Sequence, residues 1–482
     1  MKTIAALFLS LAAFHGLVAN AKQRPSPNLV FVFPDEMRAQ AMGFLGEEKV
    51  QTPVLDRFVK ESVYFSNAVS NYPVCSPTRA MIFSGQYPVK NRVIGNCTSV
   101  SAQFGCELPA ETRCWSDVLK EKGYSLGYIG KWHLDSPHAP FVNTSNNAGN
   151  VKWNEWTPPS RRHGFDYWHA YGTYDQHLRP MYWDTDAPRD SFQYYDEWGP
   201  EHEADRAIDF IRNKNGKLRK SGQPFALVVS MNPPHMDYKA VPQKYKDLYK
   251  DLPIESLINK PSIDAVGTKW GDHYRKSVKD YYAGISGVDE QFGRILKVLE
   301  EDGLAGNTLV VFTSDHGDCM GIHGEITKNN LYEESMRVPL LIRFPGRLKP
   351  HTADLLLSTP DLYPTLLGLM GFATAIPETT DGENFAGYLM TGKGRKPASQ
   401  WYMRISDGNP AGGLRGVRTD RYTFVIDQGK ENQQKVMLFD RQNDPYQLKN
   451  IAGESPELAK ELTTQLREWL MKYQDPWLKN MP

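Results

Sequence analysis

The sequence has 482 residues, and its 56 Lys and Arg residues are balanced by 56 Asp and Glu residues, so the formal net charge is zero. This balance argues against a basic protein that binds nucleic acid through its phosphates. Hydrophobic residues form 40% of the chain and charged residues 23%, which favours a folded core over disorder. The mean hydropathy of −0.52, with no long apolar run after the N-terminus, argues against a membrane-spanning body.

The N-terminus has the pattern of a secretory signal peptide. Lys2 precedes an apolar stretch at 4–18, and Ala19-Asn20-Ala21 supplies an A-x-A cleavage site. A buried N-terminal helix is the alternative, but no amphipathic period runs through the stretch. We therefore predict a signal peptide at 1–21 and an exported protein, periplasmic or secreted.

Four short apolar runs predict buried strands, and polar residues follow each of them. The runs cover residues 28–33, 124–129, 224–231 and 308–314, and helix-like stretches at 115–122 and 281–301 lie between them. This alternation predicts an α/β fold with a large, mostly parallel sheet flanked by helices. Any one of the polar residues could be a turn former, but four such strand ends together predict a site at the carboxyl edge of the sheet.

The segment from Pro73 to Gly85 predicts a turn that enters a helix, with Cys75 at the helix start. In a helix, Cys75 and Arg79 share one face, which places a guanidinium one turn from the sulfur. The segment therefore predicts an anion site that holds a reactive group. The alternative is a structural cysteine with Arg79 as a solvated charge.

Residues 75–79, Cys-Ser-Pro-Thr-Arg, resemble the C-x-P-x-R signature of the type I sulfatases, which belong to the alkaline phosphatase superfamily. Three further segments resemble family motifs in family order: residues 130–134 the G-K-W-H-L motif, residues 313–317 the T-S-D-[NH]-G motif, and residues 328–339 the K-x-x-L-Y-E-x-x-x-R-V-P motif. The resemblance extends from Pro27 to the C-terminus. It implies an alkaline phosphatase-like catalytic domain, here at 22–395, and a smaller C-terminal subdomain at 396–482.

The resemblance implies a sulfatase whose nucleophile is made from Cys75. A formylglycine-generating maturation enzyme would convert Cys75 to an aldehyde, and one hydroxyl of its hydrate would attack sulfur. Lys328 and His235 would bind sulfate, with His235 also protonating the leaving oxygen. His133 would then deprotonate the second hydroxyl and expel sulfate. Lys131 and Arg79 are expected to add positive charge around the sulfate oxygens.

The resemblance also implies one divalent cation, for which calcium is expected. Its ligands would be Asp35, Glu36, Asp315 and His316. Glu36 stands where Asp or Gln is commoner in the family, and His316 stands where Asn is common. Calcium prefers oxygen ligands, so the imidazole of His316 leaves room for another divalent ion.

The stretch from residue 161 to residue 183 is rich in aromatic residues and histidine. A packed surface loop is one interpretation. The other is a sugar subsite, because aromatic faces stack on pyranose rings while Arg and His bind hydroxyls or carboxylates. On this basis His177 and Arg179 are substrate-binding candidates. The full set of motifs, together with the secretory signal, leads us to predict a sulfated saccharide as substrate.

After about residue 395 the sequence pattern changes to one that is typical of hairpin strands. Residues 416–426 and 436–439 predict hairpin strands, and residues 455–470 predict a terminal helix. This arrangement resembles the C-terminal subdomain of the family.

Export would place all five cysteines in an oxidising compartment. With Cys75 consumed by maturation, Cys97, Cys106, Cys114 and Cys319 allow two disulfides in three pairings. We expect Cys97 to pair with Cys106, because the loop between them is short.

Two other functions remain open from the sequence. Formylglycine-dependent phosphonate or phosphodiester hydrolases share the fold, and sulfate and phosphate are similar tetrahedra. A non-catalytic protein that binds sulfated glycans and is never matured would keep the same pocket. Nucleic acid is not an expected partner, and no membrane span is expected.

Overall fold

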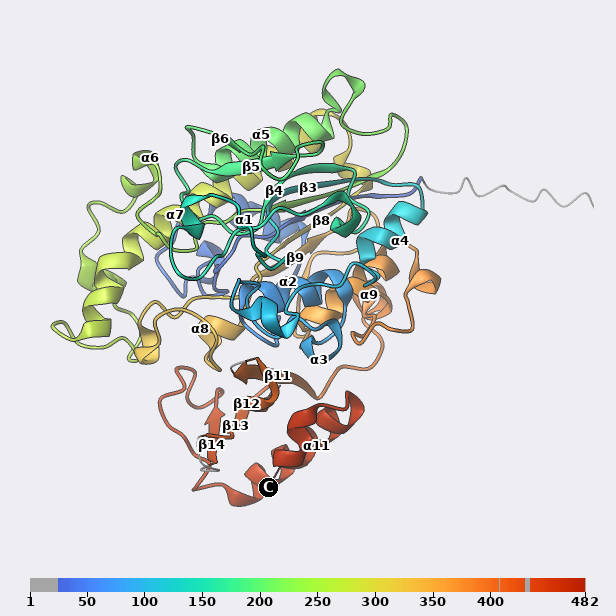
Figure 1. Cartoon of the computed structure of the whole chain (residues 1–482). Helices are drawn as coiled ribbons and strands as arrows, with labels where there is room; N and C mark the ends of the chain where they lie inside the picture. Colours follow the sequence, from blue (N-terminus) through green and yellow to red (C-terminus); the bar gives the residue numbers. More distant parts are fainter. Residues whose placement is uncertain (1–24, 407, 430–433, 482) are drawn as a thin grey trace, which may run out of the picture.

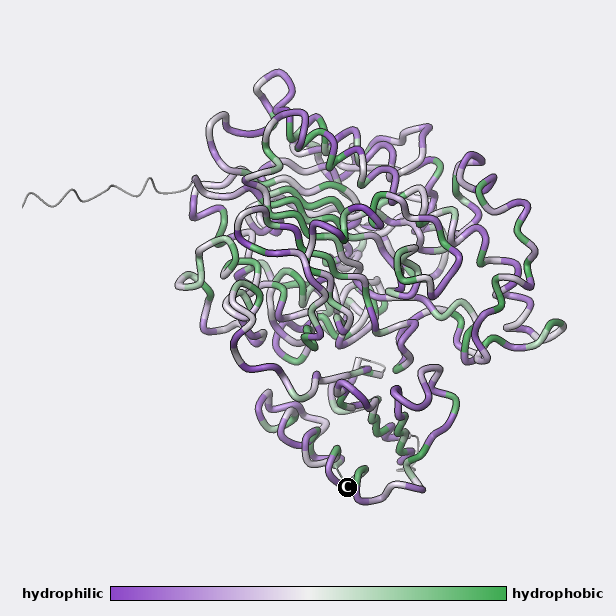
Figure 2. Tube along the Cα trace, turned by 180° about the vertical axis from the view of Figure 1, so that it is seen from behind, coloured by the Kyte–Doolittle hydropathy of each residue, from purple (hydrophilic) through white to green (hydrophobic). Residues whose placement is uncertain are grey.

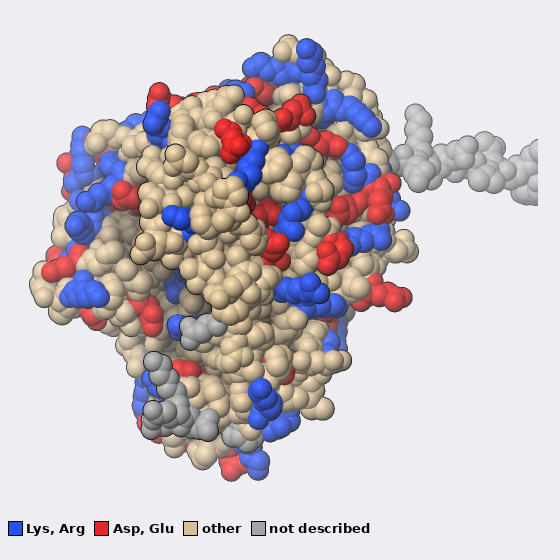
Figure 3. Space-filling model, in the orientation of Figure 1, with Lys and Arg blue, Asp and Glu red and all other residues tan. Residues whose placement is uncertain are grey.

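The computed structural model describes residues 25–406, 408–429 and 434–481, so the predicted signal peptide lies outside the described residues. A ten-stranded sheet runs through the main body, and a four-stranded sheet lies toward the C-terminus (Figure 1). In the described part of the chain, no helix combines the length and apolar character that a bilayer crossing requires. Acidic and basic side chains are interspersed over the visible surface, in keeping with the zero net charge (Figure 3).

The large sheet is mixed, with a parallel centre. Its order is β10-β2-β9-β8-β1-β7-β3-β4-β5-β6, and β8, β1, β7, β3 and β4 are parallel neighbours, whereas β9, β5 and β6 pair antiparallel. The four predicted strands are all present, and the expected fold class is confirmed. The bounds are β1 (Asn28–Val32), β2 (Val63–Phe65), β3 (Ser125–Lys131), β4 (Tyr167–Tyr171), β5 (Met181–Asp184), β6 (Gln193–Tyr194), β7 (Phe225–Ser230), β8 (Thr308–Thr313), β9 (Leu340–Arg343) and β10 (His351–Ala353).

Helices cover both faces of this sheet because successive side chains of its central strands point to opposite sides. In β1, Leu29 and Phe31 enter one core, and Val30 and Val32 enter the other. Helices α2 (Cys75–Ser84), α4 (Trp115–Glu121) and α9 (Leu362–Leu369) contribute to the first core, and α5 (Gly199–Ile211) and α7 (Lys269–Glu301) to the second. The hydrophobic strands lie in the middle of the body (Figure 2). The other α-helices of the body are α1 (Pro53–Phe58), α3 (Pro88–Asn91), α6 (Gln243–Lys246), α8 (Glu333–Met336) and α10 (Ala386–Thr391).

Helix α7 is longer than predicted. It begins at Lys269, although the apolar period predicted a start at Tyr281. The Oγ1 atom of Thr268 accepts a hydrogen bond from the backbone N–H of Gly271 at 3.1 Å, which caps the helix start. Polar residues dominate the added turns, so their sequence carries little periodic signal.

The C-terminal subdomain is a four-stranded antiparallel sheet with one long helix, as expected. Its elements are β11 (Ser399–Ser406), β12 (Asn409–Thr419), β13 (Tyr422–Asp427), β14 (Lys435–Asp440) and α11 (Pro456–Lys472). The run at 416–426 divides between β12 and β13, and β11 was not predicted. The boundary at residues 395/396 lies three residues before β11 and stays a prediction.

A buried ion pair joins the subdomain to the main body. Arg418 on β12 donates from Nε and Nη2 to the two carboxylate oxygens of Glu333, both at 2.8 Å. Burial raises the pKa of Glu333, but Arg418 and Arg441 outweigh it and lower the pKa to about 2. The pair therefore joins β12 of the subdomain to α8 of the main body through the two parallel hydrogen bonds that a planar guanidinium donates.

Replacing Glu333 by Gln should reduce the free energy of unfolding by about 3–5 kcal/mol, because Arg418 would remain buried without its partner. Urea unfolding at pH 7 measures this change. The folded-state pKa of Glu333 is depressed, so its contribution in the native chain should be complete above pH 4.5 and lost as the pH falls toward 2. Lys449→Ala, which removes an exposed ion pair with Glu454, is the matched control. Equal losses of unfolding free energy in the two variants would contradict a stabilising role for the buried ion pair.

Candidate functional site

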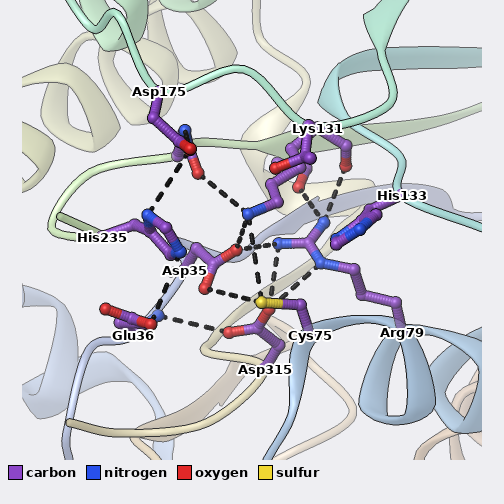
Figure 4. A network of polar contacts seen from close by, with 12 residues as sticks. Asp35, Glu36, Cys75, Arg79, Lys131, His133, Asp175, His235 and Asp315 are labelled. Carbon is purple, nitrogen blue, oxygen red and sulfur yellow. Dashed lines mark hydrogen bonds and ion pairs between the residues drawn. The ribbon is translucent and has the colours of Figure 1, made fainter. Parts of the chain in front are cut away.

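The predicted site lies where the carboxyl ends of β1, β8, β7 and β3 meet. Asp35 and Glu36 follow β1, and Asp315 and His316 follow β8. Lys131 ends β3, and His235 follows β7. The start of α2 brings Cys75 and Arg79 against these strand ends (Figure 4). Parallel pairing of the four strands thus gathers side chains that are up to 281 residues apart in the sequence, as Asp35 and His316 are.

The Cys75 sulfur is the centre of the cluster and is 1% exposed. It stands where formylglycine would carry its oxygens. Lys328 Nζ lies 3.2 Å away, His316 Nε2 3.4 Å and Lys131 Nζ 4.0 Å away. Burial raises the pKa of the Cys75 thiol, but Lys131, Lys328 and His316 outweigh it and place the pKa well below its usual value. The position therefore stabilises a negatively charged atom.

Arg79 is engaged by protein groups in this structure, and its expected role near the sulfate oxygens stays a prediction. Its Nη2 pairs with Asp35 Oδ2 at 3.1 Å and Asp315 Oδ2 at 3.0 Å, and its Nε donates to Asp315 Oδ2 at 3.1 Å. Its Nη1 donates to the Lys131 carbonyl oxygen and to Ser230 Oγ, both at 2.7 Å. All five donors are thus committed to the protein. Arg79 neutralises two buried carboxylates, which the sequence pattern alone did not indicate.

The residues present fit a divalent cation. Carboxylate oxygens of Asp35 and Asp315, the His316 imidazole and Cys75 Sγ come within 4.8 Å of one another. Glu36 is fully buried, and its Oε2 has no hydrogen-bond partner among the described residues. A buried carboxylate oxygen without a donor is costly in a protein and is suited to a metal ion. Three of the four predicted ligands, Asp35, Asp315 and His316, therefore offer a mixed oxygen and nitrogen site, whereas Glu36 groups with Asp35 and His235.

Lys131 and Lys328 both place an ammonium group against the Cys75 sulfur. Lys131 Nζ pairs with Asp35 Oδ2 at 2.7 Å and donates to Asn232 Oδ1 at 3.2 Å. Lys328 pairs with Glu36. Asn232 was missed by the sequence reasoning, although it lies two residues beyond the end of β7.

His133 has one ring nitrogen held by the backbone and one left over. Its Nε2 lies 3.2 Å from the carbonyl oxygen of Cys97. A carbonyl oxygen can only accept, so Nε2 carries the proton and Nδ1 is an acceptor. Nδ1 is buried and has no hydrogen-bond partner among the described residues. Burial lowers the pKa of His133, which keeps it neutral and suited to accept a proton.

His235 lies at the opposite side of the cluster, between two carboxylates (Figure 4). Its Nε2 is 3.5 Å from Glu36 Oε1, and its Nδ1 is 3.5 Å from Asp175 Oδ1. Burial lowers the pKa of His235, but Glu36 and Asp175 raise it, and the result is about 9. His235 therefore carries a proton at neutral pH. Asp175 was not predicted, because it lies in a loop whose position no periodicity reveals.

The two substrate-binding candidates lie in different places. His177 is buried, with Nε2 3.0 Å from the His235 carbonyl oxygen and Nδ1 3.5 Å from Asn232. It supports the loop that carries His235. Arg179 lies outside, 59% exposed, with Nε bonded to Asp196 at 3.0 Å and its guanidinium over the Tyr194 ring. A role for either residue in binding substrate stays a prediction.

Comparison with known proteins places these residues in context. The model of the sulfatase family matches residues 27–372, and the model described as N-sulphoglucosamine sulphohydrolase, C-terminal, matches residues 321–475. An endo-4-O-sulfatase of Bacteroides thetaiotaomicron is 39% identical over 95% of this chain and 94% of its own length. An ulvan-active sulfatase of Formosa agariphila is 34% identical over 93% of this chain and 82% of its own length.

Solved structures agree with these sequence matches. A Bacteroides fragilis chain described as the sulfatase yidJ superposes with a TM-score of 0.91 at 50% identity, covering 97% of this chain and all of that one. A phosphonate monoester hydrolase of Agrobacterium radiobacter shares the fold, with a TM-score of 0.68 at 21% identity over 93% of this chain and 96% of its own.

Arg79→Gln should destabilise the chain by about 3–5 kcal/mol, because two buried carboxylates lose their shared cation. It should also weaken the binding of divalent cations, because the carboxylates lose their orientation. Chemical denaturation in chelator and calorimetric titration with Ca²⁺ measure the two effects. Arg79→Lys keeps the charge but not the planar, forked set of donors. Its stability and its affinity for Ca²⁺ should therefore lie between those of Arg79→Gln and those of the native chain. If Arg79 served only a bound anion, neither substitution would lower stability in the absence of that anion.

Proposed function

Because the chain belongs to the sulfatase family and is a sulfuric ester hydrolase, we propose that it is exported and removes sulfate from a sulfated carbohydrate through a formylglycine formed from Cys75. The observation that carries the proposal is the position of two ammonium groups, buried Lys131 and partly buried Lys328, within 4.0 Å of the Cys75 sulfur. The A-x-A pattern at residues 19–21 supports export. The endo-4-O-sulfatase and the ulvan-active sulfatase, both aligned over most of this chain, support the carbohydrate substrate.

Conversion of Cys75 to formylglycine supplies a hydrate with two hydroxyls, one to attack sulfur and one whose deprotonation releases sulfate. Lys131 and Lys328 bind the sulfate oxygens and neutralise the charge that grows on them. The carboxylates they also contact, Asp35 and Glu36, keep both ammonium groups in place.

Two histidines divide the proton transfers between them. His235 holds a proton at neutral pH and donates it from Nε2 to the departing alkoxide oxygen. His133 is neutral and accepts a proton at Nδ1 from residue 75, because Nε2 is committed to the Cys97 carbonyl. Environments that separate the pKa values of two groups of one type are a common means of assigning acid and base.

A divalent cation, proposed to be calcium, would be held by Asp35, Glu36, Asp315 and His316, and it would stabilise a deprotonated hydroxyl at residue 75. Arg79 keeps Asp35 and Asp315 oriented for this role. Burial and the charge of Asp35 raise the pKa of Asp315 to about 6, so bringing the two carboxylates together has a cost that a cation would offset.

The direct test is sulfate release from defined sulfated saccharides by the exported, matured protein. We expect release from at least one of them, with formylglycine at position 75 in the mass spectrum of the tryptic peptide. Cys75→Ala is the control and should lose all activity while keeping its fold. A matured, folded protein that releases sulfate from an aryl sulfate but from no saccharide would remove the carbohydrate assignment.

Sulfate and phosphate esters of one alcohol separate the proposed activity from the phosphoester hydrolase alternative, which shares the fold. We expect kcat/KM to favour the sulfate ester, because Lys131 and Lys328 already pair with Asp35 and Glu36, which leaves little positive charge to balance a doubly charged phosphate ester. A preference for the phosphate ester of more than about tenfold, or about 1.4 kcal/mol in the barrier, would reverse the assignment.

His235→Ala should reduce hydrolysis of an alkyl sulfate by about 10²–10⁴, the usual contribution of a general acid. The loss on an activated aryl sulfate should be clearly smaller, because a phenolate of low basicity leaves without a proton. Steady-state kinetics on the two esters measures the difference. Equal losses on both esters would leave His235 as a sulfate-binding group only, since the sulfate is the same in each.

A further inference from the structure

The segment from Gly95 to Leu108 is fixed to both sides of the proposed site. At one side, the backbone N–H of Ser76, next to the nucleophile position, donates to Asn96 Oδ1 at 3.2 Å, and Ser76 Oγ accepts from the Cys97 N–H at 3.0 Å. At the other side, Leu108 N donates to the Leu134 carbonyl oxygen at 2.9 Å. We call residues 95–108 the strap.

Two buried thiols lie together in the strap. Cys97 and Cys106 are both 0% exposed and belong to the same core. Burial and the neighbouring Cys106 thiol raise the pKa of Cys97, and Cys97 lowers the pKa of Cys106. Cys106 Sγ also donates to the Gly95 carbonyl oxygen at 3.2 Å, and its own carbonyl oxygen accepts from Ser136 Oγ at 2.7 Å. Both are free thiols in the structure.

The other two cysteines have no such neighbour. Cys114 contacts His163 and belongs to one core, whereas Cys319 bonds to Asn330 and belongs to the core on the other face of the sheet. The sheet thus separates Cys114 from Cys319. Among the described cysteines, Cys97 and Cys106 alone lie against each other as a pair outside the nucleophile cluster.

We propose that Cys97 and Cys106 form a disulfide in the exported protein and that this bond positions His133. The two thiols would lose two protons and two electrons to the disulfide of a thiol–disulfide oxidoreductase. That disulfide is thereby reduced to a dithiol, and one S–S bond is exchanged for another. An oxidising compartment makes the exchange favourable.

The catalytic consequence follows from the Cys97 backbone. Its carbonyl oxygen accepts the His133 Nε2 proton at 3.2 Å, and this contact leaves Nδ1 as the base. A covalent bond between Cys97 and Cys106 restricts the strap at the residue that holds His133. Cys97 is therefore a positioning residue, which acts through its carbonyl. This consequence rests on the proposed function, whereas the disulfide itself does not.

Peptide mapping tests the disulfide. Protein exported from its host is quenched in acid, alkylated without reduction and digested. We expect one cross-linked species joining the Cys97 and Cys106 peptides, with Cys114 and Cys319 recovered as alkylated thiols. Recovery of Cys97 and Cys106 as alkylated thiols, or of either cross-linked to another cysteine, would overturn the proposal.

Kinetics of the double variant Cys97→Ser/Cys106→Ser tests the positioning role. With formylglycine content matched by mass spectrometry, we expect kcat on an aryl sulfate to fall by about tenfold while KM changes less than twofold, because sulfate contacts are kept. When the disulfide of the native enzyme is reduced, as confirmed by peptide mapping, kcat should fall to the same degree. Reoxidation should restore kcat. The double variant should not respond to reductant, and Cys114→Ser should behave like the native enzyme.

The outcomes separate the two proposals. A confirmed cross-link with unchanged kcat in the double variant would remove the positioning role and keep the disulfide. A native enzyme that cleaves no sulfate ester would contradict the proposed function, while the mapping result would stand independently.

Discussion

The site depends on one interaction: a single buried guanidinium holds two carboxylates that would otherwise repel each other. Asp35 and Asp315 come from adjacent parallel strands, and Arg79 pairs with both at 3.0–3.1 Å at zero exposure. Removing either charge from water is costly, and only a planar, fully committed donor set compensates for both. Because Arg79 lies one turn after Cys75 on α2, the same contact fixes where residue 75 stands relative to the carboxylates. The distance between nucleophile and cation ligands is therefore set by helix geometry.

The positively charged side chains of the site have different roles. Arg79 has every donor engaged by protein groups, so it acts on the site through its charge and through the carboxylates it holds. Lys131 and Lys328 lie where they contact both a carboxylate and the Cys75 sulfur, so they can serve sulfate without a large rearrangement. A sulfate ester adds one negative charge to the group, and a divalent cation adds two positive charges. The surrounding ion pairs keep the sum small in a place where unbalanced charge is expensive.

The sequence predicted the elements whose signal is local and missed those whose signal is not. Strands followed by polar residues identified the four ends that form the site, because burial on both faces leaves a continuous apolar run. The start of α7 was missed because its first turns are mostly polar and show no apolar period. Strand β11 was missed because its mixed composition shows no clear alternation. The direction in which Arg79 points depends on Asp315, 236 residues away, so i,i+4 spacing gave its face but not its partner. Asp175 lies in an irregular loop, where only the folded chain reveals its approach to His235.

Selectivity among sugars must arise outside this charged centre. In the proposed mechanism the groups around Cys75 act on the sulfate and the leaving oxygen, which all sulfate esters share, so they would not distinguish one saccharide from another. The loop at residues 172–180 lies beside this centre, where Asp175 contacts His235 and buried His177 supports the loop that carries His235. A polar group fixed in this way rejects a substrate that leaves it unpaired far more strongly than an apolar wall rejects a misfit. The Asp175 carboxylate, 38% exposed and held by Asn146 and Asn232, is a polar group fixed in this way beside His235.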